Sequence, residues 1–248
     1  MPDVYHRPTV HPPLGPVEIH VWRVRIDPVP LELTSLTATL SADEVARANR
    51  FHFERDRQRY TTGRAALRRL LGHYAGVSPG ALTFRYGGRE KPEIDQPSEA
   101  RDIMFNVSHR GDYALYAFTR GRDVGVDIEH LRDVPEALAI ARNHFTPAES
   151  ALLAAAAARG EVRECFFRFW TRKEAVIKAV GTGLSMPLDE FDVSSTTPEG
   201  DAWHTVRVPS RPETTWELRD LQPGDGYRGA LCVAGGAGEV SFWCEQLD

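Results

Sequence analysis

The order of the predicted secondary-structure elements indicates an α+β fold built from two similar α/β halves. A strand, two helices and a group of strands follow one another in the first part of the 248-residue chain, and the same order returns in the second part. No flexible linker interrupts the sequence. We therefore expect one continuous chain with a flexible lead-in at 1–16, an N-terminal half at 17–122 and a C-terminal half at 123–248.

The elements of the first half are marked by local signals. Five prolines in residues 1–16 predict a mobile or extended lead-in, and the alternating "VEIHVWRVRI" at 17–26 predicts a strand. The capping box "SADE" opens a helix that reaches about Asn49, and a longer helix with one apolar side is expected at about 56–74. A short strand and a Gly/Pro turn follow within 81–94.

The second half begins within a β-rich stretch. Three short apolar runs between 103 and 129 predict a meander. A second capping box, "TPAE", opens a helix to about Ala158, and the helix at 162–180 stops at Gly181. The remaining strands are expected at "FDVSS", "WHTVRV", "TWELRDL", "YRGALCVAG" and "VSFWCEQL".

Composition excludes several classes of protein. The formal net charge of −5 argues against a general nucleic-acid binder. Three cysteines without CxxC spacing indicate neither a disulfide framework nor a zinc site. The sequence has neither a signal-peptide pattern nor an apolar run long enough to span a membrane, so we expect a cytoplasmic protein without membrane contact.

One segment departs from this acidic average. Eight arginines lie between Arg47 and Arg69, against only Glu54 and Asp56. Such a basic segment in an acidic protein predicts an anionic ligand or partner. The alternative is a solvated, arginine-rich helix face.

The strand "DVGVDIE" carries the first candidate site. Alternation places its valines and isoleucine on one face, and Gly125, Asp127 and Glu129 on the other. The two carboxylates stand about 7 Å apart at their roots and can converge on one cation, while Gly125 leaves space for a ligand. Oxygen ligands of this kind suit Mg²⁺ and accept Mn²⁺ as well. The alternative is the wet face of a half-exposed strand.

The helix "FFRFWTRKEAVIKAVGTGL" adds an unusual lysine. Lys173 falls within the apolar arc, and Glu174 and Lys178 are neighbours one turn apart at its edge. A buried ammonium without a partner is costly, so Lys173 must reach an anion or a water-filled cleft. The structural alternative for Lys173 is a side chain that snorkels to solvent, and the alternative for Glu174 and Lys178 is a surface ion pair.

Two further segments suggest phosphate contacts. Ser108 and His109 end the strand "FNVSH", where hydroxyl, imidazole or backbone N–H groups can meet a phosphate. A nucleophile with its base is the alternative, but no G-x-S-x-G elbow surrounds the pair. Lys91, in the turn "GREKPEI", is another candidate, or else an ordinary turn lysine.

Together, these segments closely resemble the 4′-phosphopantetheinyl transferases of the surfactin-synthetase-activating (Sfp) type. That family's V/I-G-V/I-D-x-E and W-S/T-x-K-E-A/S-x-x-K motifs match "VGVDIE" (124–129) and "WTRKEAVIK" (170–178). "FNVSH", "KP" at 91–92, "GLSMPLDEFDV" and the arginine-rich helix also match, in the family's order, over about 41–193. The chain departs from the family pattern at Glu90 and Arg110.

The resemblance implies a fold of two similar halves related by a pseudo-two-fold, with coenzyme A held between them. It also implies an enzyme, a holo-[acyl-carrier-protein] synthase, that transfers 4′-phosphopantetheine from coenzyme A to a serine hydroxyl of an apo acyl or peptidyl carrier protein. Adenosine 3′,5′-bisphosphate is released, Mg²⁺ is required, and we expect a monomer. The carrier would belong to fatty-acid, polyketide or non-ribosomal-peptide biosynthesis.

The resemblance also implies roles for individual residues. The Mg²⁺ ligands would be Asp127, Glu129 and Glu174, and the catalytic residues Glu174 and Lys178. We hypothesise that Glu174 is the base, directly or through metal-bound water, and that Lys178 stabilises the leaving bisphosphate. Contacts to coenzyme A are expected from Arg47, Arg59, Arg89, Lys91, Asn106, Ser108, His109, Asp127, Lys173 and Lys178.

Two other functions compete with this one. Clustered carboxylates and lysine also serve Mg²⁺-dependent phosphodiesterases and nucleases, although the acidic net charge disfavours such an enzyme. A non-catalytic coenzyme A- or nucleotide-binding module that docks a carrier is the other alternative. Loss of a carboxylate or of Lys178 would mark such a module, and the sequence retains all of them.

Overall fold

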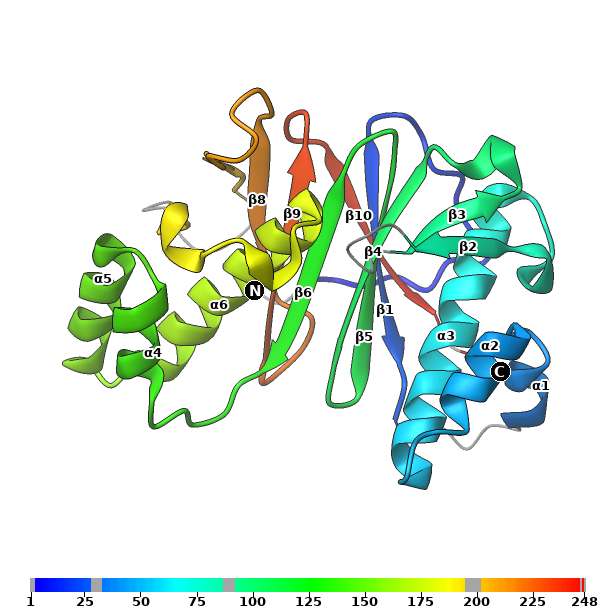
Figure 1. The fold of residues 1–248 in the computed structure, drawn as a ribbon, viewed down its shortest axis with the longest axis horizontal. Coiled ribbons are helices and arrows are strands. Elements are labelled where there is room, and N and C mark those ends of the chain that lie inside the picture. The colour runs from blue at the N-terminus through cyan, green and yellow to red at the C-terminus, as the bar shows by residue number, and fades with distance from the viewer. Residues whose placement is uncertain (1–2, 28–32, 87–91, 195–201, 246, 248) are drawn as a thin grey trace. The chain divides into compact units, whose positions relative to one another are not determined.

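The structure is a computed structural model that describes residues 3–27, 33–86, 92–194, 202–245 and 247 (Figure 1). The predicted α+β fold is confirmed, and the chain forms two compact units. The N-terminal unit contains Val4–Phe105, His109–Gly121 and Glu239–Asp248. The C-terminal unit contains Met1–Asp3, Asn106–Ser108 and Arg122–Gly238.

The N-terminal unit is a mixed four-stranded sheet covered by helices. Its elements are β1 (Glu18–Arg25), α1 (Leu33–Thr37), α2 (Ala42–Ala48), α3 (Glu54–Ala75), β2 (Thr83–Tyr86), β3 (Pro92–Gln96), β4 (Ile103–Arg110), β5 (Tyr113–Arg120) and β10 (Glu239–Glu245). The sheet order is β10-β1-β5-β4, with β1 parallel to β10 and antiparallel to β5, and β2 and β3 form a separate pair.

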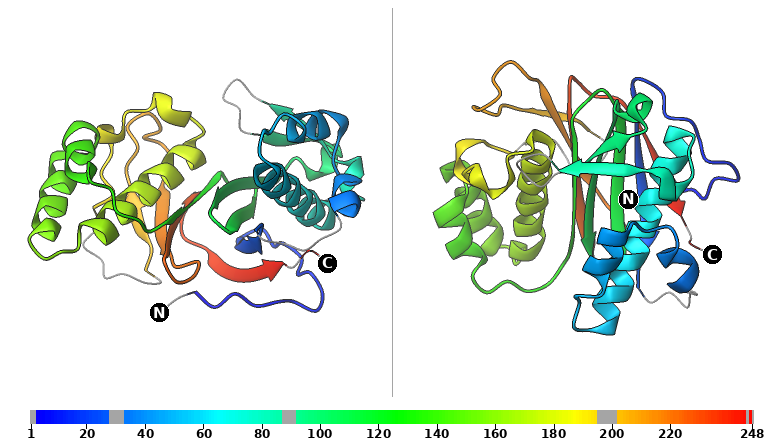
Figure 2. Two further views of the ribbon diagram at one scale, coloured as in Figure 1. Left: turned by 90° about the horizontal axis from the view of Figure 1, so that it is seen from below. Right: turned by 45° about the vertical axis from the view of Figure 1, so that its right-hand side comes forward.

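Within its described residues, the C-terminal unit is an antiparallel four-stranded sheet with three α-helices. Its elements are β6 (Val124–His130), α4 (Ala137–His144), α5 (Pro147–Ala157), α6 (Val162–Val180), β7 (His204–Val206), β8 (Trp216–Leu221) and β9 (Tyr227–Ala234). The sheet order is β6-β9-β8-β7, and α6 packs along β6, β8 and β9 (Figures 1 and 2).

The two units repeat one topology, which confirms the prediction of two similar halves. In the part of each unit that the structure describes, a first strand is followed by three α-helices, and a later strand returns antiparallel beside that first strand. The returning strand is β5 beside β1 in the N-terminal unit and β9 beside β6 in the C-terminal unit. The strand that precedes it, β4 or β8, lies next in the sheet.

Buried polar contacts fix α3 on its sheet. Tyr74 Oη accepts a hydrogen bond from Trp22 Nε1 at 2.7 Å and lies 2.7 Å from His20 Nδ1. Tyr116 Oη donates to the carbonyl of Gly63 at 2.7 Å. These contacts join the middle and the end of α3 to β1 and β5.

The local predictions agree with the structure where they depend on periodicity or capping. Both capping boxes form, at Ser41 and Thr146, and α6 ends at Gly181 in a left-handed conformation with φ of 73°. Residues 4–16 form no helix or extended strand, and they are held to the N-terminal unit by His6, which bridges to Trp243, and by His11, which lies 2.8 Å from Glu245.

Four expectations differ from the structure. The run at 124–130 does not continue a meander, because β6 pairs with β9 in the other sheet. Residues 239–245 join the N-terminal unit by pairing with β1, so the units depart from the expected 17–122 and 123–248. "FDVSS" forms no strand over its described residues, and helices α1 and α4 were not predicted. Strand pairing is non-local, and sequence periodicity carries no information about it.

Candidate active site

Two elements of the C-terminal unit carry the main candidate residues. Strand β6 carries Asp127 and Glu129, and helix α6 carries Glu174 and Lys178. Gly125 allows these elements to meet, since a Cβ there would overlap the carbonyl oxygen of Ala175 and the amide nitrogen of Ala179. The prediction that Gly125 leaves space for a ligand is therefore wrong, because the backbone of α6 occupies that space.

Asp127 lies at the centre of a buried hydrogen-bond network. Its Oδ1 accepts a hydrogen bond from Lys178 Nζ at 2.7 Å and another from Ser108 Oγ at 2.8 Å. Lys178 Nζ also donates to Ser108 Oγ at 2.9 Å. Asp127 is 5% exposed, whereas the Lys178 side chain is 26% exposed, so the lysine links a buried carboxylate to the solvent side of the site.

The segment Asn106–Ser108 positions β6. Asn106 Oδ1 accepts a hydrogen bond from the backbone N–H of Val126 at 2.9 Å, and Ser108 holds the carboxylate one residue further on. The motif "FNVSH" thus supplies two side chains that hold strand β6 and Asp127. This positioning role was not predicted, because the sequence does not reveal which strand faces Asn106 and Ser108.

The carboxylates around Asp127 leave negative charge that is only partly compensated. Burial raises the pKa of Glu174, and the charges of Asp127 and Glu129 raise it further, while Lys178 opposes them. Glu129 accepts a hydrogen bond from Arg132 at 2.8 Å. The raised pKa of Glu174 therefore reflects its burial first and its carboxylate neighbours second.

This donor set fits a hard divalent cation. Asp127 Oδ2 is buried and finds no hydrogen-bond partner among the described residues, which is costly for an oxygen of a charged group. Within the same residues, no three His, Cys, Asp or Glu side chains lie close enough together to form a ready-made metal site. Mg²⁺ does not need such a cage, since it commonly takes one or two carboxylates and keeps waters and substrate oxygens.

Lys173 does not belong to this site, which corrects its predicted contact with coenzyme A. Its Nζ lies 2.8 Å from Glu149 Oε2 and donates to the carbonyls of Leu188 and Phe191 at 2.6 and 2.8 Å. The side chains of Lys173 and Glu149 are both 0% exposed. An ammonium has three donors, and three acceptors already occupy them. The anion that the sequence predicted for Lys173 is therefore the buried carboxylate of Glu149.

Glu149 has a structural role that the sequence did not predict. Besides its bond to Lys173, it accepts hydrogen bonds from the backbone N–H of Thr146 at 2.9 Å and of Val193 at 2.7 Å. It therefore connects the start of α5, the middle of α6 and the segment that follows α6. The capping box identified its position, but its partner is distant in sequence and gave no local signal.

The remaining candidates lie elsewhere. Arg47, Arg59 and His109 belong to the N-terminal unit, and Arg89 and Lys91 lie outside the described residues. Arg59 is paired with Asp27, with an Nη2–Oδ2 distance of 2.6 Å. The guanidinium of Arg47 lies 5.6 Å from the ring centroid of Tyr60.

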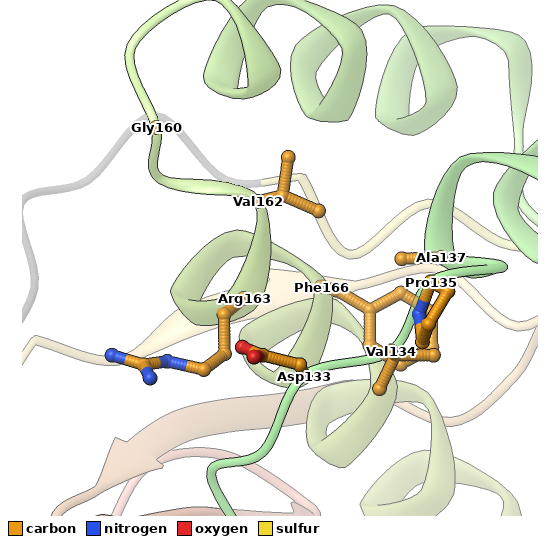
Figure 3. A pocket seen from close by; sticks show the side chains of 8 residues that line it. All are labelled: Asp133, Val134, Pro135, Ala137, Gly160, Val162, Arg163 and Phe166. Atoms are coloured by element: carbon orange, nitrogen blue, oxygen red, sulfur yellow. The ribbon is translucent and has the colours of Figure 1, made fainter.

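The C-terminal unit also has an apolar groove of about 290 Å³ away from the carboxylates. Figure 3 shows Asp133 and Arg163 at one end and Pro135 and Ala137 at the other, with Phe166 contributing to its lining. None of the carboxylates of the Asp127 network lines it.

Comparison with known proteins agrees with this geometry. A model of the 4′-phosphopantetheinyl transferase superfamily matches residues 123–232, and a model of the N-terminal region of 4′-phosphopantetheinyl transferases matches residues 24–120. The chain belongs to the 4′-phosphopantetheinyl transferase superfamily, and the prediction of a transferase enzyme is confirmed.

Three relatives illustrate the similarity. The 4′-phosphopantetheinyl transferase HetI of a Nostoc species is 38% identical over 91% of this chain and 92% of its own. Psf-1 of Bacillus pumilus is 32% identical over 82% of each chain. Sfp of Bacillus subtilis is 29% identical over 79% of this chain and 82% of its own. In the described part of the chain, no helix is long and apolar enough to cross a membrane.

Proposed function

We propose that this protein transfers 4′-phosphopantetheine from coenzyme A to a serine hydroxyl of an apo acyl or peptidyl carrier protein, in the manner of the Sfp type. The observation that carries the proposal is the contact of Lys178 with Asp127, which joins the two halves of the family's signature at 2.7 Å. Membership of the superfamily supports the transferase activity itself.

The reaction forms a bond between the serine Oγ and the phosphorus that carries pantetheine. The bond from that phosphorus to the bridging oxygen breaks, and adenosine 3′,5′-bisphosphate leaves with the bonding electron pair. Negative charge therefore grows on the leaving group. Lys178, partly exposed beside a buried carboxylate, is suited to stabilise that charge electrostatically.

The serine must lose its proton as it attacks. Glu174, which interacts electrostatically with Asp127 and Lys178, is our candidate acceptor. Asp127, Glu129 and Glu174 would hold Mg²⁺, with Mn²⁺ as a substitute. When bound, the cation would neutralise charge on the phosphate oxygens. Ser108 and Asn106 keep β6 and Asp127 in place.

Positive side chains of the N-terminal unit are proposed to bind the phosphates of coenzyme A. Arg47, Arg59 and His109 match the family's positions for this contact, and Arg59 is already held by Asp27. We also propose that the protein is a cytoplasmic monomer. Lys173 is removed from the proposed contacts because it is buried and fully bonded.

Product release tests the proposal. Purified protein, coenzyme A and a panel of apo carriers would be combined with and without Mg²⁺, and adenosine 3′,5′-bisphosphate would be quantified chromatographically. We expect release that needs both carrier and metal and is absent in Asp127→Ala. Coenzyme A binding without release on any carrier would favour the non-catalytic module instead.

A further inference from the structure

A surface between α2 and α3 displays two aromatic side chains to solvent. Phe53 is 66% exposed and Phe51 is 38% exposed. Single exposed apolar residues are common, but two within three positions, next to the exposed Arg50, His52 and Arg55, form an apolar and basic patch. We call these five residues the α2–α3 surface.

The local backbone holds this surface in place. The backbone N–H groups of Arg50 and Phe51 donate to the carbonyls of Arg47 and Ala48 at 3.1 and 3.2 Å, which closes the end of α2. The Phe51 ring packs 5.4 Å from the ring of Tyr60. Phe51 is therefore anchored on α3, and the display of Phe53 is a feature of the folded chain.

Phe53 also occupies a position where a polar residue would stabilise the fold. It is the N-cap of α3 and makes no side-chain capping bond, whereas the shorter helix α5 is capped by Thr146. Ser, Thr, Asp or Asn at such a position typically contributes about 1 kcal/mol over an apolar residue. A residue that violates a local rule and is exposed to water is a signal of function.

The charge around the two rings indicates what the surface contacts. Residues 47–59 contain five arginines but only Glu54 and Asp56, in a chain with a net charge of −5. Glu54 is paired with Arg57, and Asp27 holds both Arg55 and Arg59. Exposed aromatic and arginine side chains are the residues enriched in protein interfaces, and arginines select carboxylates on the partner.

We propose that the α2–α3 surface docks the apo carrier protein through a carrier face that presents carboxylates around an apolar centre. This inference rests on the proposed function, which supplies the carrier as partner. Binding of the phosphates of coenzyme A would account for the arginines, but it would not account for two solvent-exposed phenyl rings. A protein face with apolar and acidic side chains uses both.

Steady-state kinetics with separate titrations of carrier and coenzyme A test the proposal. In Phe53→Ser and Arg50→Glu, we expect KM for the carrier to rise about tenfold, as for loss of an interface anchor, with KM for coenzyme A unchanged. Leu152→Ser and Arg207→Glu are matched controls on exposed positions of the C-terminal unit and should leave both values unchanged. The carrier KM of the wild type should rise with NaCl more steeply than that of Arg50→Glu.

The other outcomes would each overturn the proposal. An unchanged carrier KM in both variants removes the docking role, and a raised KM for coenzyme A alone would assign Phe53 to the nucleotide. If the carrier KM were unchanged but sedimentation showed that the protein self-associates and that Phe53→Ser abolishes the association, the surface would be assigned to a second copy. If the carrier KM were unchanged but the protein bound phosphatidylserine vesicles and Phe53→Ser abolished the binding, the surface would be assigned to a membrane.

Failure of the proposed function is distinguishable from failure of this inference. If the wild type transferred nothing to any carrier, binding of fluorescently labelled apo carriers would be measured directly. Weaker binding to Phe53→Ser than to Leu152→Ser would then sustain docking without transfer. Absence of any binding, or equal binding to both variants, would overturn the docking inference as well.

Discussion

Lys178 Nζ donates a 2.7 Å hydrogen bond to Asp127 Oδ1, and Ser108 Oγ contacts both. The three residues come from α6, β6 and β4, yet they form one network within the C-terminal unit. The network connects the acidic strand motif to the helix motif and to "FNVSH".

Replacing Lys178 by methionine should lower kcat by about 10²–10³, the usual effect of removing one preformed group that stabilises developing charge. The replacement keeps the length of the stem, but it removes the ammonium partner of the buried Asp127 carboxylate, so we expect some loss of stability as well. Single-turnover transfer measured by mass, together with urea unfolding, separates the two effects. Wild-type kcat in Lys178→Met would exclude Lys178 from the reaction.

Gly125→Ala should damage both stability and activity. The added Cβ would collide with backbone atoms of Ala175 and Ala179, which cannot move as a flexible side chain can. We expect a loss of about 1–3 kcal/mol in the free energy of unfolding and a marked fall in turnover as α6 shifts from β6. Urea unfolding and transfer assays provide the measurement, with Gly80→Ala as the control because open space surrounds that position. An unaffected Gly125→Ala enzyme would contradict the close approach.

Lys173→Met should unfold the protein more readily without a specific effect on coenzyme A. Removing one partner of a buried pair leaves Glu149 charged and uncompensated, and such changes cost about 3–5 kcal/mol. Chemical denaturation gives the free energy, and calorimetry below the unfolding transition gives the affinity for coenzyme A. A stable variant with weakened coenzyme A binding would restore the sequence-based prediction for this lysine.

The free energy of unfolding should also decrease as the pH is lowered from about 6.5 to about 4, in part because of His204. Burial lowers the pKa of His204 to about 4, and the charge of Arg172 contributes. The unfolded chain has the ordinary value of about 6.5, so it binds the proton first as the pH falls, and the folded state loses on the order of 3 kcal/mol over this window. Above pH 6.5 this contribution is fully present.

Denaturation midpoints at pH 7 and pH 4.5 test the role of His204. The pKa values of His20 and His73 are lowered as well, so His204→Leu should flatten part of the acid loss rather than all of it. An identical pH dependence in wild type and His204→Leu would rule out the histidine as a contributor.

Local sequence signals predicted much of the fold and part of the site. Periodicity located β1, α3 and α6, and the capping boxes at Ser41 and Thr146 marked two helix starts correctly. Motif order led to the superfamily and to the residues around Asp127. These features depend on neighbours within a few positions along the chain, where spacing alone carries the information.

The features that sequence did not predict are contacts between distant segments. The buried partner of Lys173 is Glu149, on another helix, and the space beside Gly125 is filled by α6. Strand β10 crosses to the N-terminal sheet, and β6 pairs with β9. In each case the hydrophobic pattern of the segment is compatible with more than one partner segment, and only tertiary packing selects one of them.

Intact-mass analysis of apo carrier proteins would show phosphopantetheine transfer itself. Carriers would be incubated with the protein, coenzyme A and Mg²⁺, in parallel with Asp127→Ala and with reactions lacking metal. We expect a carrier to gain the mass of one phosphopantetheine on a serine, only with metal and only with Asp127 intact. Carriers that remain unmodified across the panel while coenzyme A binds, or full modification by Asp127→Ala, would contradict this expectation.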